Sequence, residues 1–262
     1  MQPLKNCILL KKNLIYLTLL VVSLFSCKKE DEIEPPRDIG EQALADEQSL
    51  EDFLSTHFYN YEDFDDLSLQ PELVFDTLSG ANAGKTPLIN QVSKSAIRVK
   101  ISDGSFVNHS MYTLVAREGV GASPTRVDST YLSYEGLLLN KTSFDRSFAP
   151  IWFDLTSVVR GFGEGMPALR AGEFTVDQNN ATSFTNYGQG AVFLPSGLGY
   201  YSNATGSIPA YSPLIFKIDL YLVKQTDHDG DGILSALEFD NDGDGIADDT
   251  DGDGIPDYQD ID

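Results

Sequence analysis

The pattern of apolar and polar positions predicts several strands in the second half of the chain. It is clearest over residues 214–222, where the even-numbered positions from 216 to 222 are apolar and Lys217, Asp219 and Tyr221 lie between them. Successive side chains of a strand point to opposite faces of its sheet, so this period of two predicts a strand with one buried side. Shorter runs of β-branched and aromatic residues predict further strands at 112–117, 129–134 and 191–194.

One stretch near the N-terminal third of the chain has helical character. Its apolar stripe consists of Leu50, Phe53, Leu54, His57 and Phe58. This spacing predicts an amphipathic helix, with Asp46 or Ser49 as the residue that caps its start. We expect His57 to pack against the domain and not to bind a metal, because no second ligand-type residue is spaced with it.

A second helical stretch covers residues 158–169, and Pro167 should end or bend it because proline has no backbone N–H to donate. Four or more antiparallel strands and one short helix predict an α+β fold in which the helix lies against one face of the sheet. With 262 residues, of which 41% are hydrophobic, the chain can hold one compact domain of ordinary size together with extensions.

The N-terminal residues indicate export and anchoring. Three lysines precede an apolar run at 14–25, which is too short to span a membrane and suits the core of a signal peptide. The following Leu24-Phe25-Ser26-Cys27 resembles the cleavage site of bacterial lipoproteins. We therefore expect residues 1–26 to be removed and lipidated Cys27 to anchor the protein in a membrane, followed by a charged tether at 27–40 and an extension at 41–109. The expected location is the bacterial outer membrane, on its periplasmic or its cell-surface face.

Cysteine content and charge exclude other classes of protein. Cys7 lies within the predicted signal peptide, so no disulfide is expected after cleavage. Cleavage removes three lysines and no acid, which changes the net charge from −22 to about −25. Such an acidic chain is not expected to bind nucleic acid. Residues 226–262 hold 14 acidic residues and no lysine or arginine, so the acidity is concentrated there.

Aspartates in this acidic segment recur with a fixed glycine. Positions 1, 3, 5, 6, 7, 9 and 12 of a calcium-binding loop are occupied by Asp227, Asp229, Asp231, Gly232, Ile233, Ser235 and Glu238. The pattern resembles thrombospondin type 3 repeats or dockerin-like loops and predicts structural Ca²⁺, because alternate carboxylates of a turned loop direct their oxygens at one hard cation. The expected ligands are Asp227, Asp229, Asp231, Ile233, Glu238, Asp240, Asp242, Asp244, Asp249, Asp251, Asp253 and Asp257.

Aromatic and branched apolar residues scattered between 134 and 216 accompany one carboxylate. Tyr134 precedes the pair Phe144-Asp145 by ten residues, and Val158-Val159-Arg-Gly-Phe162 opens the second helical stretch. The later members are Tyr200, Ile208-Pro209 and Phe216. At these spacings residues 112–224 resemble the FKBP-type peptidyl-prolyl cis-trans isomerases, although Phe162 stands where that family more often has tryptophan.

The resemblance implies an FKBP-like antiparallel sheet wrapped on one short helix at 110–225, between an N-terminal helical extension and a calcium-loop tail at 226–262. It implies that Tyr200 donates a hydrogen bond to a substrate carbonyl and that Asp145 orients the substrate. The implied pocket walls are Tyr134, Phe144, Val158, Val159, Phe162, Ile208 and Phe216. The expected partners are proline-containing polypeptides, and catalysis would need no cofactor.

A second hypothesis assigns no catalysis to the same residues. In it the FKBP-like domain only binds peptides, as part of a surface lipoprotein whose tail is stiffened by calcium. Lipoproteins of the bacterial gliding machinery resemble this arrangement. Turnover of a prolyl test peptide distinguishes the two hypotheses.

Overall fold

The computed structural model describes residues 35–66 and 69–261, and residues 37–262 belong to one compact unit. The predicted signal peptide, Cys27 and most of the tether lie outside the described residues. Among the residues that the structure describes, no helix has both the length and the apolar content needed to cross a bilayer.

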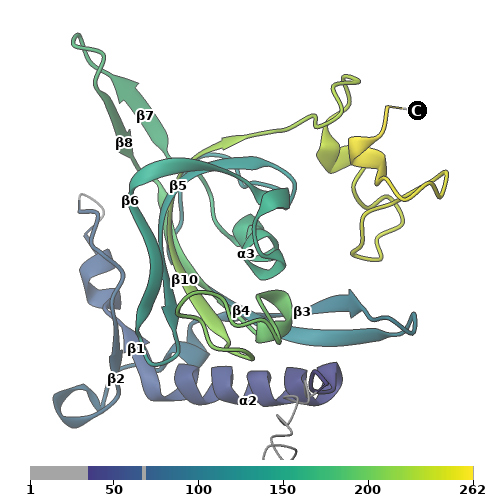
Figure 1. Ribbon diagram of the computed structural model, residues 1–262. Coiled ribbons are helices and arrows are strands. Elements are labelled where there is room, and N and C mark those ends of the chain that lie inside the picture. Colours follow the sequence, from purple (N-terminus) through teal and green to yellow (C-terminus); the bar gives the residue numbers. More distant parts are fainter. Residues whose placement is uncertain (1–34, 67–68, 262) are drawn as a thin grey trace, which may run out of the picture. The chain divides into compact units, whose positions relative to one another are not determined.

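An antiparallel sheet is the centre of this unit (Figure 1). Within the described part of the chain it has six strands in the order β3-β4-β9-β10-β5-β6. The strands are β3 (Ser93–Lys100), β4 (Phe106–Arg117), β5 (Ser129–Leu138), β6 (Ser143–Asp154), β9 (Gly188–Leu194) and β10 (Leu214–Lys224). The predicted strands at 112–117, 129–134, 191–194 and 214–222 all lie in this sheet, which confirms the antiparallel α+β prediction.

A helix covers each face of the sheet. On one face lies the short α3 (Arg160–Gly165), which a 3₁₀ turn (Met166–Ala168) containing Pro167 follows, so the proline ends the α-helix as expected. On the other face lies the longer α2 (Ile39–Thr56), seen below the sheet in Figure 1. We call these the α3 face and the α2 face. Each has its own buried apolar cluster, and neighbouring residues of one strand contribute to different clusters, such as Val192 to the first and Phe193 to the second.

The start of α2 differs from the prediction. Its N-cap is Asp38, whose side chain accepts hydrogen bonds from the N–H groups of Gly40 and Glu41, and neither Asp46 nor Ser49 caps the helix. Leu50 and Leu54 are fully buried as the apolar stripe predicted. The helix stops at Thr56, because the chain turns into β1 (His57–Tyr59), which pairs with β2 (Phe75–Thr77). His57 stacks on Phe53, with 4.0 Å between ring centroids.

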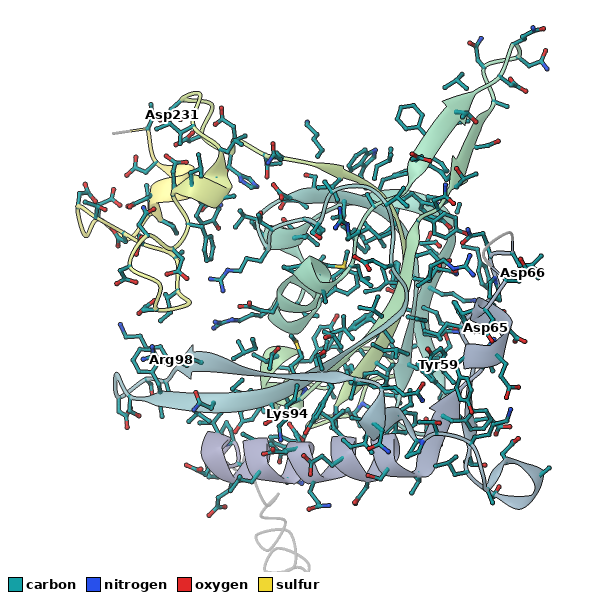
Figure 2. All side chains as sticks on the ribbon, turned by 180° about the vertical axis from the view of Figure 1, so that it is seen from behind. Tyr59, Asp65, Asp66, Lys94, Arg98 and Asp231 are labelled. Atoms are coloured by element: carbon teal, nitrogen blue, oxygen red, sulfur yellow. The ribbon has the colours of Figure 1, made fainter. Side chains whose placement is uncertain are left out.

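Polar contacts fix α2 against the sheet. Asp46, in the middle of the helix, is 1% exposed. Its carboxylate accepts hydrogen bonds from Gln42 Nε2 at 2.7 Å and from Ser196 N and Oγ at 2.8 and 2.6 Å. At the outer edge, Lys94 of β3 forms ion pairs with two glutamates of α2, and Figure 2 shows this lysine beside the helix. The extension is therefore held to the sheet through apolar and polar contacts.

The expectation that β10 has one buried side is wrong. Ile215 is fully buried against the α2 face while Phe216 and Ile218 are buried on the α3 face, because helices cover both sides of the sheet. A bulge between Leu220 and Leu222 then interrupts the alternation, since an extra residue on one strand shifts the side chains that follow. Val223, and not Leu222, packs against the α3-face cluster.

The expected boundary between the N-terminal extension and the isomerase domain, at residues 109 and 110, falls inside β4. The whole of β3, another strand of the same sheet, lies before this boundary. Residues 41–109 therefore supply strands and a covering helix to the same sheet. The pattern did not indicate β6, because half of the residues of this edge strand are exposed and they do not alternate regularly. The Asn- and Thr-rich segment before β9 forms a projecting hairpin of β7 (Glu173–Val176) and β8 (Thr182–Thr185) (Figure 1).

Candidate functional site

A cavity of about 440 Å³ opens on the α3 face of the sheet. Residues far apart in the sequence meet there, because β5, β6 and β10 form its back and the α3 segment forms its side. Its lining consists of Tyr134, Asp145, Phe153, Ser157, Val158, Val159, Phe162, Tyr200 and Phe216. The structure thus brings together seven of the nine predicted site residues in one cavity.

The floor of this cavity is the ring of Phe162, which is 2% exposed. Three other rings approach it edge to face: Phe216 at 5.1 Å between centroids, Phe153 at 5.9 Å and Tyr134 at 6.4 Å. Edge-to-face pairs at these distances are favourable beyond their burial, because the positive ring edge meets the negative face. The floor is therefore a rigid apolar surface.

Two glycines let α3 lie directly on β9. A Cβ atom added to Gly165 would come within 2.4 Å of Val192 Cγ2, and one added to Gly161 within 2.9 Å of Leu194 Cβ. Any larger residue at 165 would therefore push the helix away from the sheet. Since Phe162 lies between these glycines, their close packing determines the depth of the cavity floor.

At the polar rim of the cavity, the Tyr134 hydroxyl donates a hydrogen bond to Asp145 Oδ2 at 2.5 Å. Burial, and then this bond to the carboxylate, raises the pKa of Tyr134 well above its usual range, so the phenol stays protonated and donates. Asp145 itself is exposed. It lies at the mouth of the cavity and orients Tyr134.

Tyr200 lines the cavity shortly after the turn that Asp46 holds at Ser196. Its hydroxyl forms no hydrogen bond with any of the described residues. The neighbouring Tyr201 differs, because its hydroxyl donates to the carbonyl of Arg37. Tyr200 therefore presents a free donor to whatever occupies the cavity.

Two predicted wall residues do not line the cavity. Phe144 packs edge-on against Phe216 at 5.6 Å and covers Gly136, and Ile208 is 5% exposed in the core beneath. The sequence prediction missed Phe153 and Ser157. Strand alternation could have found Phe153, since its neighbour Trp152 is 50% exposed on the opposite face.

The acidic tail forms three clusters of carboxylates whose oxygens lie within 4.8 Å of one another. The clusters are Asp227, Asp229 and Asp231; Asp240, Asp242 and Asp248; and Asp249, Asp251 and Asp253. Asp248 was not predicted. Asp244 and Asp257, which were predicted, lie outside these clusters. Asp244 accepts from Ile246 N, and Asp257 accepts from Thr250 N and Oγ1.

These loops fit a hard cation. The glycines at 232, 245 and 254 have φ values of +99°, +85° and +96°, which permit the sharp turn in each loop. Asp229 Oδ2, Glu238 Oε2 and Asp240 Oδ1 are buried oxygens without a hydrogen-bond donor among the described residues. Burial, followed by the charges of nearby aspartates, raises the pKa of Glu238. Unpaired oxygens that face like charges are what calcium coordination would satisfy.

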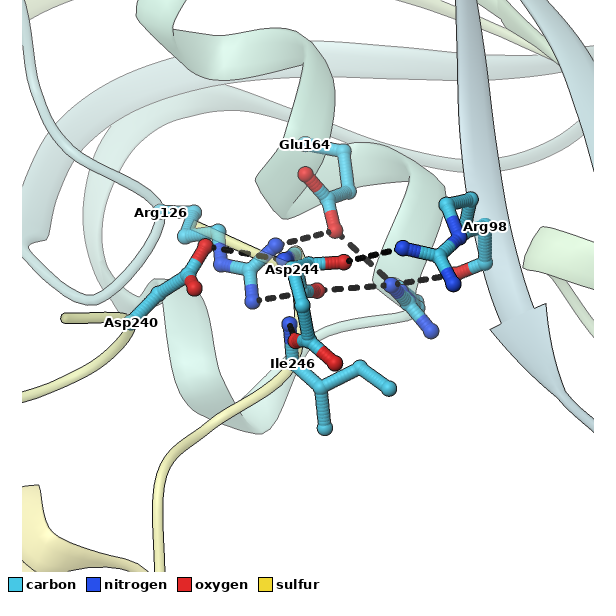
Figure 3. Close-up of polar contacts among 8 residues, drawn as sticks. Arg98, Arg126, Glu164, Asp240, Asp244 and Ile246 are labelled. Atoms are coloured by element: carbon cyan, nitrogen blue, oxygen red, sulfur yellow. Dashed lines mark hydrogen bonds and ion pairs between the residues drawn. The ribbon is translucent and has the colours of Figure 1, made fainter. Parts of the chain in front are cut away.

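The second loop contacts arginines on and beside α3 through its backbone (Figure 3). The Gly245 carbonyl accepts from Arg126 Nη2 at 2.9 Å and from Arg160 Nη2 at 3.2 Å, while Arg98 donates to the Asp244 carbonyl at 3.4 Å. Glu164 of α3 pairs with Arg126 at 2.8 Å and with Arg160 at 3.2 Å. The tail therefore docks beside α3, which carries Phe162.

Comparison with known proteins assigns a family to the region around the cavity. Residues 121–221 match the family described as FKBP-type peptidyl-prolyl cis-trans isomerase. Two relatives are 32% identical: the isomerase FkpA of Aeromonas hydrophila over 120 residues, and the isomerase Mip of Coxiella burnetii over 115 residues. The matches cover 45% and 42% of this chain but only 39% and 44% of those proteins, so the chain spans less than half of either relative.

Among solved structures, FkpA of Escherichia coli is 25% identical over 48% of this chain and 51% of its own. Its TM-score of 0.37 is too low to add to the assignment, which therefore depends on the sequence matches. Those matches include β5, β6, α3, β9 and most of β10, the elements that enclose the cavity. Residues 121–221, which enclose most of the cavity, thus match the FKBP-type peptidyl-prolyl cis-trans isomerase family.

Proposed function

We propose that the protein isomerises X-Pro peptide bonds of polypeptides that enter the cavity on the α3 face. The observation that carries this proposal is the apolar floor, in which three rings surround the buried Phe162. Rotation about the bond crosses a barrier of about 20 kcal/mol, where the twisted amide has lost its conjugation and is less polar than the planar ground state. An apolar cavity binds that twisted form better than the planar one, and each ~1.4 kcal/mol of this preference accelerates the reaction tenfold.

The cavity residues then have distinct tasks. Phe162, Phe216 and Phe153 receive the prolyl ring and exclude water. The free hydroxyl of Tyr200 donates to a substrate carbonyl and fixes the peptide, so that the amide next to proline rotates. Asp145 holds Tyr134 in place at the rim through their hydrogen bond. No step requires a nucleophile, a metal or a cofactor.

The N-terminal sequence extends this proposal to the protein's place in the cell. Its lipoprotein-like signal and Cys27 would anchor the mature chain to the bacterial outer membrane, and the tether would hold the domain away from the lipid. The clients would then be exported proteins whose folding or assembly waits for prolyl isomerisation, which takes tens of seconds without catalysis.

Tyr200→Phe tests the assigned donor. We expect kcat/KM on a proline-containing test peptide to fall about tenfold, because a hydrogen bond to the substrate is worth ~1.4 kcal/mol in the transition state. The measurement is a protease-coupled isomerisation assay. Tyr201→Phe is the matched control, since it removes the same group from a neighbour that does not line the cavity. If the unmutated protein shows no turnover yet binds the peptide, the non-catalytic alternative replaces the proposal.

For the tail, the proposal is that residues 226–262 bind structural calcium through the three carboxylate clusters. Support comes from the convergence of their oxygens, from the positive-φ glycines and from the buried unpaired oxygens of Asp229, Glu238 and Asp240. Calcium would neutralise the repulsion among these aspartates. The backbone of the second loop would then stay in the conformation in which its Gly245 carbonyl accepts hydrogen bonds from Arg126 and Arg160.

Calorimetry tests calcium binding. We expect heat of binding with millimolar Ca²⁺ and a weaker response with Mg²⁺, because magnesium demands stricter octahedral geometry. Asp242→Asn should lower the number of bound ions, while Asp177→Asn, in the exposed β7–β8 turn, should leave it unchanged. Absence of any calcium-dependent heat in the unmutated protein would reject the tail proposal.

A further inference from the structure

Another cavity, of about 260 Å³, lies on the α2 face of the sheet. It is opposite the cavity on the α3 face, which we call the proline cavity. Its base is β5, β9 and β10, and residues 70–73 form one wall. Strand register places Ser133, Asp219 and Gln189 side by side across these three strands. These polar side chains form a row on a covered part of the sheet face. Such a part of a sheet is normally apolar.

The Asp219 carboxylate in this row forms no ion pair with any of the described residues. Among the described residues its hydrogen-bond donors are neutral groups, Gln189 Nε2 at 2.9 Å and Ser133 Oγ at 3.2 Å. Lys217 lies two residues away, but its ammonium pairs with Glu135 at 2.5 Å and with Glu72 at 3.2 Å. Burial raises the pKa of Asp219, so a positively charged neighbour would favour its ionised form.

Gln189 provides a second polar group that a ligand could satisfy. Its side chain is 1% exposed and lines the cavity. Because its Nε2 donates to Asp219 and to the Pro71 carbonyl, the amide orientation is determined, and Oε1 is left as a buried acceptor without a donor among the described residues. An unsatisfied buried acceptor is unfavourable, so a ligand that donates an N–H group to it would bind more tightly.

The aromatic residues around this cavity favour a cation over a neutral donor. Tyr221 is a lining residue and contacts the ring of Tyr187 at 4.5 Å, while Phe148 lies at the rim and is 71% exposed. Ring faces attract guanidinium and ammonium groups. Of the charged lining residues, three are acidic and only Lys217 is basic. The volume suits one long side chain and is too small for most drug-sized ligands.

We propose that this cavity binds a basic side chain, an arginine or a lysine, of a polypeptide on the face of the sheet opposite the proline cavity. The charged end would pair with Asp219 and donate to Gln189 Oε1, and its aliphatic stem would lie against Phe148. This binding does not depend on isomerase activity, so either proposal can fail alone.

Peptide titration tests this site in the purified protein. The probe is the blocked tripeptide acetyl-Gly-Arg-Gly-amide, and the readout is the fluorescence of Trp152, the single tryptophan, which contacts Tyr131 on the same face at 5.3 Å. Calorimetry measures the same equilibrium independently. We expect the arginine peptide to bind at least tenfold more tightly than its neutral isostere with citrulline, and Asp219→Asn to weaken arginine binding about tenfold.

Further variants separate loss of the site from loss of the fold. Asp219→Asn should keep unmutated prolyl turnover, because Asp219 lies on the other face, and Asp145→Asn should leave arginine binding unchanged. If Asp219→Asn does not fold, Phe148→Ala at the exposed rim is expected to weaken binding several-fold. Equal affinity for the arginine and citrulline peptides would overturn the proposal. Tighter binding of free spermidine than of the tripeptide would overturn the peptide as ligand.

Discussion

Phe162→Ala should lower kcat/KM for a prolyl test peptide about a hundredfold and reduce the free energy of unfolding by about 3–5 kcal/mol. Both effects have one cause. The buried ring is the common neighbour of Phe153, Phe216 and Tyr134, so its removal leaves a hole under the cavity and releases three rings from fixed positions. Urea denaturation measures the stability, and the protease-coupled assay measures turnover in the absence of urea.

The control for this variant is Phe174→Ala in the projecting hairpin, where the ring is 55% exposed. It should change neither quantity appreciably, because an exposed ring loses little burial on truncation. Phe162→Trp restores an apolar floor and should recover most of the turnover. A folded Phe162→Ala protein with unchanged kcat/KM would show that substrate does not contact this floor.

Asp46→Ala should lower the free energy of unfolding by about 2–4 kcal/mol, although the residue lies outside both cavities. The substitution removes the acceptor for Gln42 Nε2 and for Ser196 N and Oγ, so three donors lose their partner in a buried position. Turnover should also fall, because the turn at Ser196 precedes Tyr200. Asp52→Ala, exposed on the same helix, should have little effect on unfolding in urea.

The pH dependence of this contribution has a definite sign. Burial raises the pKa of Asp46 above its ordinary value of 3.8, despite the hydrogen bonds from Ser196 and Gln42 that oppose the shift. The folded protein therefore holds this proton more tightly than the unfolded chain. The resulting stabilisation is complete below pH 3.8 and is lost as the pH rises through the folded pKa. The free energies of unfolding of wild type and Asp46→Asn, measured from below pH 3.8 to neutral pH, should converge or cross as the pH rises. Parallel curves of free energy against pH would contradict the raised pKa.

Local patterns predicted the elements that depend on local contacts. The strand at β10 and the buried Leu50 and Leu54 followed from periodicity alone. The start of α2 did not, because Asp46 suits a cap as well as Asp38 does, and only the distant Ser196 explains why Asp46 is buried. The second covered face of β10 was equally hidden, since it depends on a helix more than 150 residues away in the chain.

In the candidate site, too, some residues could be located from the sequence and others depended on distant contacts. Spacing that resembles a family located Tyr134, Val159 and Phe162, which β5 and the α3 segment bring to one cavity. The contact of Asp145 with Tyr134 could not be predicted, because it depends on the pairing of β5 with β6, a strand that the pattern did not indicate. The cavity around Asp219 could not be predicted, because the register of three strands and the path of residues 70–73 together create it.

The arginine contacts with the tail also affect which sequence changes the tail tolerates. Arg98, Arg126 and Arg160 bind carbonyl oxygens of residues 244 and 245, groups that every amino acid possesses. Exchange of most side chains near this point would therefore leave the contact intact, apart from Gly245 with its φ of +85°. An insertion or deletion of a single residue would displace the carbonyls and break it. Docking thus constrains the length of this loop, while ion binding constrains the identity of its acidic residues.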